Sequence, residues 1–259
     1  MTAQPTDNGL PRRVVVTGGS SGIGLAVARH FLSAGASVGI IGRNQTRLDA
    51  AAAESGPAAG SRLAAACADV SDEPRLQAAI DELAGKLGGI DALVTAAGAE
   101  GEMGAACEDV TADSFREVLD INVTGTFLAV RHALPHLKRA ENASIVMIIG
   151  SDSGFVAVPG MLAYNASKGA LVQLTRALAV ELFDAHGIRA NSVCPSIVDT
   201  PMARRGLRVD SFADAAYPVQ APEDIAWTVG YLASSHSRAV NGVNLLSDFG
   251  FTGRSSFPA

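Results

Sequence analysis

The chain has 259 residues, of which 48% are hydrophobic, and its formal net charge is −6. That hydrophobic content supplies a sizeable core and argues against a disordered chain. Because acidic and basic residues are interspersed in an acidic chain, we expect no nucleic-acid partner and no binding to an anionic membrane. The three cysteines, Cys67, Cys107 and Cys194, are odd in number and far apart, which predicts neither a disulfide framework nor a metal site.

We find no signal peptide before Arg12 and no apolar run long enough to span a bilayer, so we expect a cytoplasmic protein. Residues 1–11 are polar and contain Gly and Pro, and are predicted to be a flexible tail. Apolar runs of strand length then alternate with helical patterns. In chain order the patterns predict a strand at 13–18, a helix at 23–35, a strand at 37–43, a helix at 45–55, a strand within 62–70, a helix at 72–88, a strand at 90–98, a helix at 113–139, a strand at 143–151, a helix from Tyr164 to about Ala185, a strand at 187–195, a helix at 222–234 and a strand at 242–248.

Continuous apolar strands that alternate with helices are typical of a parallel sheet covered on both faces. We find no repeat or linker that would divide the chain. The prediction is an α/β protein with one doubly wound, Rossmann-type domain over residues 12–259, built on a parallel sheet of about seven strands.

A glycine-rich stretch, VVVTGGSSGIGLA, follows the first predicted strand and places Gly18, Gly22 and Gly24 at the junction with a helix. A phosphate approaches the backbone closely only where no side chain intrudes, and the helix start offers free N–H groups. A tight turn without a ligand is the alternative. The spacing T-G-x-x-x-G-I-G differs from the usual dinucleotide fingerprint G-x-G-x-x-G.

A second stretch, AYNASKGA, places Tyr164 and Lys168 four residues apart, on one face of a helix. Together with the glycine loop at Thr17–Gly24, this stretch resembles the short-chain dehydrogenase/reductase family in its short, single-domain form. The resemblance extends from Arg13 to about Gly250. The motifs ADV at 68–70, INVTG at 121–125 and CPSIVDTPM at 194–202 stand in the family's order, and Ser151 precedes Tyr164 by the family's thirteen residues.

The resemblance implies a catalytic set of Asn122, Ser151, Tyr164 and Lys168. It also implies that a nicotinamide dinucleotide is bound by Gly18, Ser20, Ser21, Gly22, Ile23, Gly24, Arg43, Asp69, Val70, Ala97, Gly98, Tyr164, Lys168, Pro195, Val198 and Thr200. Asp69 would contact the adenine, and the segment from Pro195 to Thr200 would hold the nicotinamide. Ser153, two residues after Ser151, is a further candidate for contact with the substrate.

The sequence departs from the family pattern in three places. The usual N-N-A-G is Thr95-Ala96-Ala97-Gly98, the usual Pro-Gly is Pro195-Ser196, and the late V-D-G-G is Ser247-Asp248-Phe249-Gly250. The first change removes an asparagine contact and keeps the Gly98 backbone. The other two lie toward the substrate, so the substrates of relatives do not transfer to this chain.

The Tyr–Lys pair explains the expected chemistry. A phenol with a pKa of roughly 10 is a poor base at neutral pH, and a nearby ammonium lowers that pKa. Tyr164 then exchanges a proton with the oxygen of a carbonyl or alcohol in step with hydride transfer. The resemblance implies that Lys168 also binds the cofactor ribose, that Ser151 donates to the substrate oxygen, and that Asn122 holds a water linking Lys168 to solvent. A surface helix with an ordinary Tyr/Lys pair is the alternative.

Other polar groups give weaker signals. His132 and His136 have a possible metal spacing, but no third ligand is evident and Pro135 separates them, so we expect a surface or interface role and no metal. Three arginines, Arg204, Arg205 and Arg208, lie where the family has its substrate lid; a solvated loop is the simpler interpretation, and an acidic substrate the other.

The sequence thus predicts an oxidoreductase that interconverts a ketone and a secondary alcohol, with a small-molecule carbonyl or alcohol as its substrate. A ketoreductase acting on acyl carrier protein ranks lower because Val180 stands where such relatives tend to have a basic residue. An enoyl reductase is disfavoured because that branch spaces its tyrosine and lysine more widely. A non-catalytic dinucleotide sensor is the alternative from another class, although such relatives typically lose the tyrosine or lysine.

Two further expectations concern the cofactor and the assembly. Gly42 stands where an NAD-specific member would have an acid, and Arg43 follows it, so NADP(H) is favoured, with NAD(H) as the alternative. The helix at 113–139 and the helix from Tyr164 carry apolar residues around much of their circumference, which predicts a homotetramer or homodimer. The residues that suggest it are Phe127, Val130, Leu171, Leu174 and Leu178.

Overall fold

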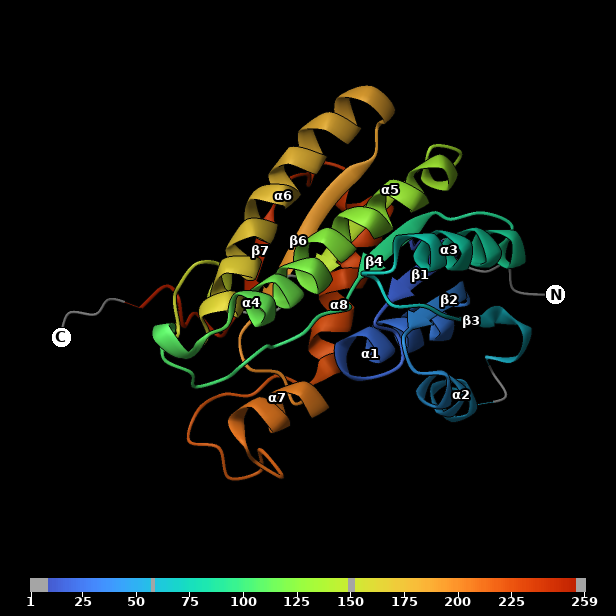
Figure 1. Cartoon of the computed structure of the whole chain (residues 1–259). Coiled ribbons are helices and arrows are strands. Elements are labelled where there is room, and N and C mark those ends of the chain that lie inside the picture. The colour runs from blue at the N-terminus through green and yellow to red at the C-terminus, as the bar shows by residue number, and fades with distance from the viewer. Residues whose placement is uncertain (1–8, 57–58, 149–151, 255–259) are drawn as a thin grey trace.

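The computed structural model describes residues 9–56, 59–148 and 152–254. Seven parallel strands form one sheet in the order β3-β2-β1-β4-β5-β6-β7 (Figure 1). The strands are β1 (Arg13–Thr17), β2 (Ser37–Gly42), β3 (Leu63–Cys67), β4 (Ala92–Thr95), β5 (Ser144–Ile148), β6 (Arg189–Pro195) and β7 (Asn244–Ser247). This sheet confirms the predicted doubly wound fold. The order reverses beside β1, where Val16 pairs with Ile40 of β2 and with Val94 of β4.

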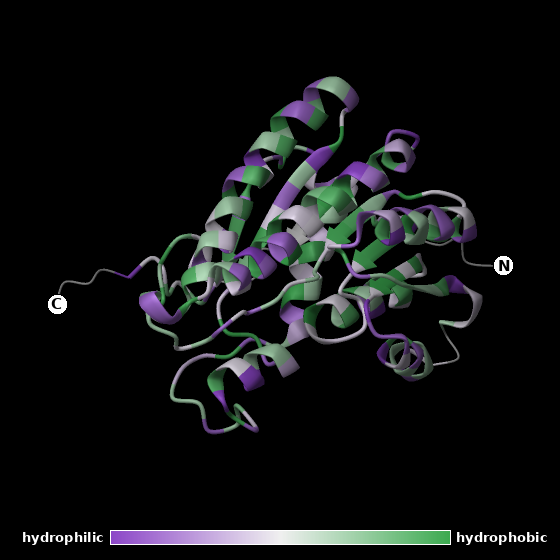
Figure 2. Ribbon diagram, viewed as in Figure 1, coloured by the Kyte–Doolittle hydropathy of each residue, from purple (hydrophilic) through white to green (hydrophobic). Residues whose placement is uncertain are grey.

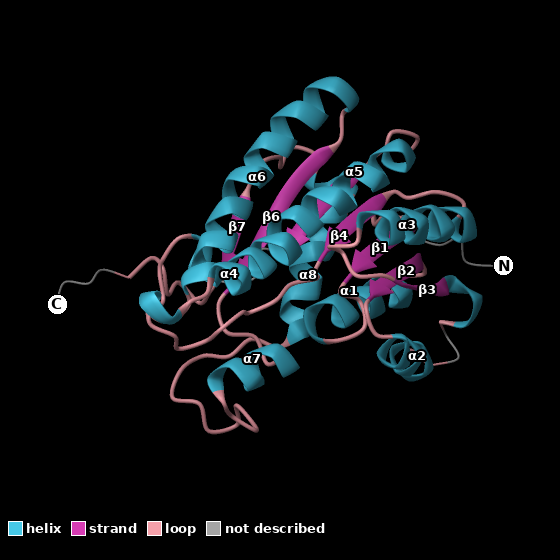
Figure 3. Cartoon of the chain, in the orientation of Figure 1, coloured by secondary structure: helices cyan, strands magenta, loops and turns pink. Residues whose placement is uncertain are grey.

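Helices cover both faces of the sheet (Figure 3). The long helices are α1 (Gly22–Ser33), α2 (Gln45–Glu54), α3 (Glu73–Leu87), α4 (Ala112–Leu119), α5 (Gly125–Leu137), α6 (Leu162–His186) and α8 (Pro222–Ala233). One core cluster joins the sheet to α3, α5 and α6, and the other joins it to α1, α2 and α8. The sheet therefore lies between two apolar layers.

The strands form because their side chains are buried on both faces. In β1, Val15 packs into one core cluster, whereas Val14 and Val16 pack into the other. Such a strand is a continuous β-branched run without polar alternation, as parallel sheets require. Figure 2 shows the central strands in the colour of hydrophobic residues, with hydrophilic positions along the helices.

Two elements differ from the prediction. The pattern at 113–139 is α4 and α5 joined by a π-helical turn at Asp120–Thr124, and Pro135 is accommodated inside α5. The region after β6 was predicted as a loop but contains α7 (Pro201–Leu207). Its start has ordinary helix signals, because the Thr200 hydroxyl accepts a hydrogen bond from Ala203 N at 3.1 Å and Pro201 is the first helical residue.

The chain ends are described in part. Gly9 O accepts a hydrogen bond from Ser235 N at 2.8 Å, and Leu10 packs against the core, so residues 9–11 lie on the domain. Residues 1–8 are outside the described part of the chain, and for them the flexible tail stays a prediction.

Most of the apolar residues that suggested an oligomer have partners within the chain itself. Val130, Leu171 and Leu178 are buried in the core, and Leu174 packs against it. Phe127 is 44% exposed. The oligomeric state therefore stays a prediction that rests on a smaller exposed surface than the sequence pattern suggested.

Candidate active site

The glycine loop between β1 and α1 has no room for side chains. Gly18 has a φ of +68°, and a Cβ on it would lie 2.7 Å from the backbone of Ala96 and Ala97. A Cβ on Gly24 would clash with the carbonyl oxygen of Gly18. Helix α1 begins at Gly22, and the side chain of its N-cap, Ser21, makes no capping hydrogen bond. The loop and the first turn of α1 thus present bare backbone to a ligand.

A cavity of about 1300 Å³ lies against this loop. It is lined by every predicted cofactor-binding residue, by Tyr164 and Lys168, and by the substrate candidate Ser153. Asn122 is not among the lining residues, and Ser151 is outside the described part of the chain. The structure therefore brings residues from β1, β2, β6 and α6 to one place at the reversal of the strand order, where such sheets bind ligands.

Tyr164 and Lys168 meet inside this cavity. They come from the first turns of α6, and Lys168 Nζ lies 4.9 Å from the centre of the Tyr164 ring. The lysine is 6% exposed, and burial lowers its pKa to about 8. Within the described part of the chain its ammonium makes no hydrogen bond or ion pair. A buried ammonium that lines a cavity and has no hydrogen-bond acceptor is a natural site for the polar group of a ligand.

The pKa of Tyr164 moves opposite to the prediction. Burial of the phenol raises its pKa, and the carboxylates of Glu100 and Asp152 raise it further. The net shift is therefore upward, against the lowering predicted from Lys168, because lost solvation and two nearby carboxylates both disfavour the phenolate. A positively charged nicotinamide beside the phenol would lower the pKa of Tyr164.

Asn122 lies in the π-helical turn and holds two segments together. Its Oδ1 accepts from Ala99 N at 2.8 Å, and its Nδ2 donates to Ala99 O at 3.0 Å and to Ser167 Oγ at 2.9 Å. Asn122 is 1% exposed. It thereby fixes the segment after β4 against the turn of α6 that carries Lys168, and the water relay assigned to it stays a prediction.

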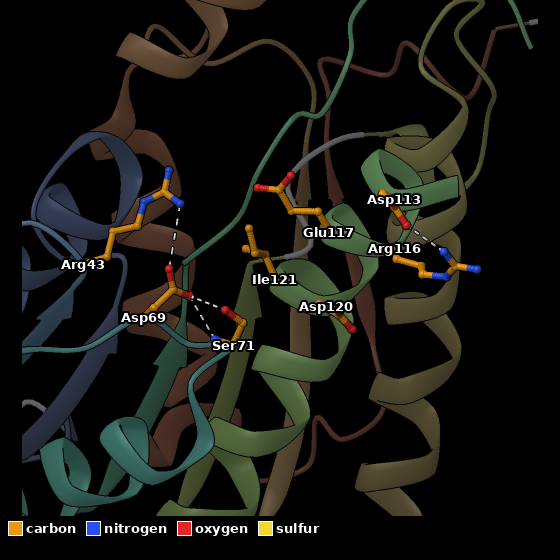
Figure 4. A pocket seen from close by; sticks show the side chains of 8 residues that line it. All are labelled: Arg43, Asp69, Ser71, Asp113, Arg116, Glu117, Asp120 and Ile121. Carbon is orange, nitrogen blue, oxygen red and sulfur yellow. Dashed lines mark hydrogen bonds and ion pairs between the residues drawn. The ribbon is translucent and has the colours of Figure 1, made fainter. Parts of the chain in front are cut away.

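The far end of the cavity holds the candidates for the adenosine half of a dinucleotide. Arg43 forms a loose ion pair with Asp69, 3.9 Å between Nη1 and Oδ2, and the arginine side chain is 71% exposed. Asp69 Oδ1 also accepts hydrogen bonds from Ser71 N and Oγ. Figure 4 shows this group beside α4, where a smaller pocket of about 280 Å³ also takes in Asp113, Arg116, Glu117, Asp120 and Ile121.

Sequence reasoning missed several cavity residues. Arg47, on the first turn of α2, lines the same end as Arg43, and Asn44 caps that helix by accepting from Arg47 N at 3.0 Å. The cavity is also lined by apolar residues and by the tail after β7: Met103, Val158, Met161, Leu207, Tyr217, Phe249, Phe251 and Arg254. The start signal of α2 was readable, but the direction in which Arg47 points was not.

Helix α7 and the loop after it, residues 201–218, are called the lid segment below, and they project from the body of the domain (Figure 1). Thr200 precedes the segment, and Ala203, Arg205 and Leu207 line the cavity. Arg204 pairs with Asp199 through two hydrogen bonds of 2.6 and 2.9 Å, whereas Arg205 pairs with Glu100 across the cavity at 3.2 Å. Two of the three predicted loop arginines are thus engaged with carboxylates of the protein.

The remaining polar candidates lie elsewhere. His132 pairs with Glu73 at 3.0 Å, and His136 pairs with Asp81 at 2.8 Å, so both join α5 to α3. Within residues 9–56, 59–148 and 152–254, no cluster of three or more His, Cys, Asp or Glu has the arrangement of a metal site. In the same residues no helix is both long and apolar enough to cross a membrane.

A nicotinamide dinucleotide fits these residues. The glycine loop is a cradle that a Cβ would fill, the start of α1 offers free N–H groups to the pyrophosphate, and Lys168 offers a buried ammonium. Val198 and Thr200 also border the cavity, and Thr200 lies against the glycine loop, 3.3 Å from where a Cβ on Gly22 would be.

Comparison with known proteins agrees with this fit. A family model described as Enoyl-(Acyl carrier protein) reductase matches residues 18–252. The chain belongs to the short-chain dehydrogenase/reductase family. It is 36% identical over 250 residues to 2-(R)-hydroxypropyl-CoM dehydrogenase of Xanthobacter autotrophicus, with 94% of this chain and 99% of that protein covered.

Two solved structures of the family contain a dinucleotide. A 3-ketoacyl-(acyl-carrier-protein) reductase from Brucella melitensis complexed with NADH has a TM-score of 0.82 at 30% identity, covering 92% of this chain and 97% of that one. ElxO with NADP bound has a TM-score of 0.85 at 26% identity, covering 95% and 100%. The family makes this chain an oxidoreductase, and these relatives support a nicotinamide dinucleotide as its cofactor.

Proposed function

We propose that this enzyme interconverts a ketone and a secondary alcohol, with NADP(H) as the favoured cofactor and Tyr164 as the acid/base group. The observation that carries the proposal is the position of Tyr164 and Lys168, side by side on α6 within the cavity that the glycine loop borders. The spacing of four residues between them is also the reason to favour this reaction over enoyl reduction, despite the description of the family model.

Each residue has a defined task. When bound, the nicotinamide supplies or accepts the hydride. In the reducing direction the Tyr164 hydroxyl donates its proton to the carbonyl oxygen, and Ser151 donates a second hydrogen bond to that oxygen. Lys168 holds the ribose and, with its pKa lowered to about 8, returns a proton toward Tyr164. The raised pKa of Tyr164 keeps the donor protonated at neutral pH, which suits reduction, whereas oxidation calls for alkaline conditions.

The walls of the substrate end indicate the kind of molecule that fits. Met103, Val158, Met161, Leu207 and Tyr217 supply apolar surface to the cavity that Tyr164 also lines. We therefore expect a ketone whose other substituents are mainly apolar. A β-ketoacyl thioester is the second candidate, since a ketoacyl reductase is among the structural relatives. Val180, where such reductases tend to have a basic residue, is 64% exposed and offers no charge to a carrier protein.

The test is reduction of a panel of ketones, including cyclohexanone, 2,3-butanedione and acetoacetyl-CoA, followed by the absorbance of NADPH. We expect turnover of at least one ketone and a tyrosine-dependent rate. Tight binding of NADPH without turnover of any panel member would favour the non-catalytic dinucleotide sensor.

Cofactor preference is tested with the two arginines at the adenosine end. A guanidinium that binds the 2′-phosphate contributes about 1.5–3 kcal/mol, so Arg43→Ala and Arg47→Ala should each lower kcat/KM for NADPH by roughly tenfold or more and leave NADH nearly unchanged. Arg75→Ala is the matched control, since Arg75 is an exposed arginine on α3 outside the cavity. A clear preference for NADH that neither variant changes would refute the assignment.

A further inference from the structure

Glu100 stands on a segment that is anchored on both sides. Before it, the backbone of Ala99 is bound at both N and O by the Asn122 side chain. After it, Gly104 N donates to Gly160 O at 2.8 Å, which ties the segment to the turn before α6. The backbone of Glu100 is therefore fixed relative to the helix that carries Tyr164, and both residues line the same cavity.

Arg205 reaches this carboxylate from the other side of the cavity. Its Nη2 lies 3.2 Å from Glu100 Oε1, and the side chains are 58% and 23% exposed, respectively. The next residue, Gly206, packs on the same segment, since a Cβ there would lie 3.1 Å from Met103 Cε. The ion pair thus joins the lid segment to the segment after β4, at the cavity that both segments line.

The charge around Tyr164 is supplied from several elements. Asp152 and Glu100 are the carboxylates that act on the phenol, and the Arg205 guanidinium is bound to the latter. The Asp248 carboxylate is hydrogen-bonded within its own loop, because it accepts from Gly250 N, Thr252 N and Thr252 Oγ1. The titratable and charged groups on the elements around Tyr164 are Glu100, Asp152, Lys168, Cys194, Arg205 and Asp248.

We propose that Glu100 and Arg205 form an electrostatic positioning pair for the Tyr164 hydroxyl, with Glu100 on the wall of the cavity that Tyr164 also lines and Arg205 holding and partly neutralising it from the lid segment. The proposal rests on the proposed function of Tyr164 as the acid/base group. Neither residue transfers a proton; both act through the charge that they place beside the phenol.

The signs of the expected effects are opposite for the two residues. Glu100→Gln removes a negative charge, which makes the phenolate less unfavourable, so the pH at which alcohol oxidation reaches half its plateau should fall. Arg205→Ala leaves Glu100 without its partner, so that pH should rise. We expect shifts of roughly 0.3 to 1 pH unit, with the smaller one for Arg205, because its greater exposure lets solvent screen its charge.

Two neighbours provide matched controls. Arg204→Ala removes the same charge from the same helix, but Arg204 pairs with Asp199 and does not line the cavity. Glu102→Gln removes a carboxylate two residues from Glu100 that is exposed and outside the cavity. Both controls should keep the wild-type pH profile.

The experiment measures kcat for NADP-dependent oxidation of cyclohexanol, or of the panel alcohol turned over fastest, from pH 6 to 11, and the Kd of NADPH by its fluorescence. Opposite pH shifts, with the NADPH Kd within about twofold of wild type, support the proposal. If the pair only fastens the lid segment, both variants should weaken NADPH binding alike and shift the profile in the same direction or not at all, which would overturn it. Tyr164→Phe distinguishes failure of the positioning pair from failure of the proposed function. Near-wild-type turnover in that variant would refute the proposed function itself.

Discussion

Arg189 provides a sharp test of what holds the sheet to α8. It is the first residue of β6, it is 6% exposed, and it forms no ion pair within the described residues. Its guanidinium instead donates to backbone carbonyl oxygens and one hydroxyl at the end of α8 and in the turn after it. The acceptors are Leu232 O at 2.9 Å, Ser234 O at 3.0 Å, Ser237 Oγ at 3.0 Å, Ser237 O at 3.2 Å and Val240 O at 3.3 Å.

The perturbation is Arg189→Met, which keeps most of the volume and removes every donor. Four carbonyls then lose a charged donor and each keeps another hydrogen-bond donor, while the cost of burying the guanidinium is relieved. The loss of these charge-assisted hydrogen bonds costs about 1.5–3 kcal/mol. For a domain of this size that corresponds to a fall in Tm of roughly 3–12 °C.

The assay is thermal unfolding followed by circular dichroism, with Arg238→Met as the control because Arg238 is an exposed arginine in the same turn. Ser237→Ala should fall in between, since its hydroxyl shares one proton between Leu232 O and Ser234 O, both at 2.9 Å, and accepts from Arg189. A Tm for Arg189→Met that is no lower than that of Arg238→Met would refute the reasoning.

Three further predictions follow from the site and the surface. Gly18→Ala should weaken NADPH binding about tenfold or more, because a left-handed backbone disfavours Ala and its Cβ would meet the backbone of Ala96 and Ala97; Gly85→Ala, with open space around it, should bind normally by the same fluorescence titration. Lys168→Met should unfold at a higher temperature than wild type at pH 7. The pKa of Lys168 is 10.5 in the unfolded chain and about 8 in the folded one, because burial disfavours the charged form. The buried charge therefore destabilises the fold fully below pH 8, and this destabilisation disappears as the pH rises toward 10.5. An equal Tm difference at pH 7 and pH 10 would contradict that sign. Light scattering at micromolar concentration should show a dimer or tetramer, and a monomer would refute the predicted assembly.

Much of the fold was predictable because its signals are local. Val14, Val15 and Val16 face two cores at once, so the strand is a plain apolar run, and the same holds for β2 and β4. The glycine loop and the Tyr164–Lys168 pair were equally visible, since the spacing along one loop or one helix is enough to place them together.

What escaped prediction depends on segments that are distant in the sequence. The pKa of Tyr164 is raised first by burial and then by Glu100 and Asp152, which no helical spacing connects to it. Arg47 reaches the cavity because α2 packs on β2 and β3 with one particular face inward. The short helix α7 has no apolar stripe, so Thr200 and Pro201, which begin it, were interpreted as part of a loop.

The central claim is that Tyr164 transfers the proton in a nicotinamide-dependent reaction. Its most direct test is Tyr164→Phe, measured for NADPH affinity and for turnover of the best panel ketone. The account predicts an NADPH Kd within about twofold of wild type and a rate lower by roughly a hundredfold or more, because only the proton-transfer group is removed. A rate near that of wild type, with cofactor binding intact, would contradict it.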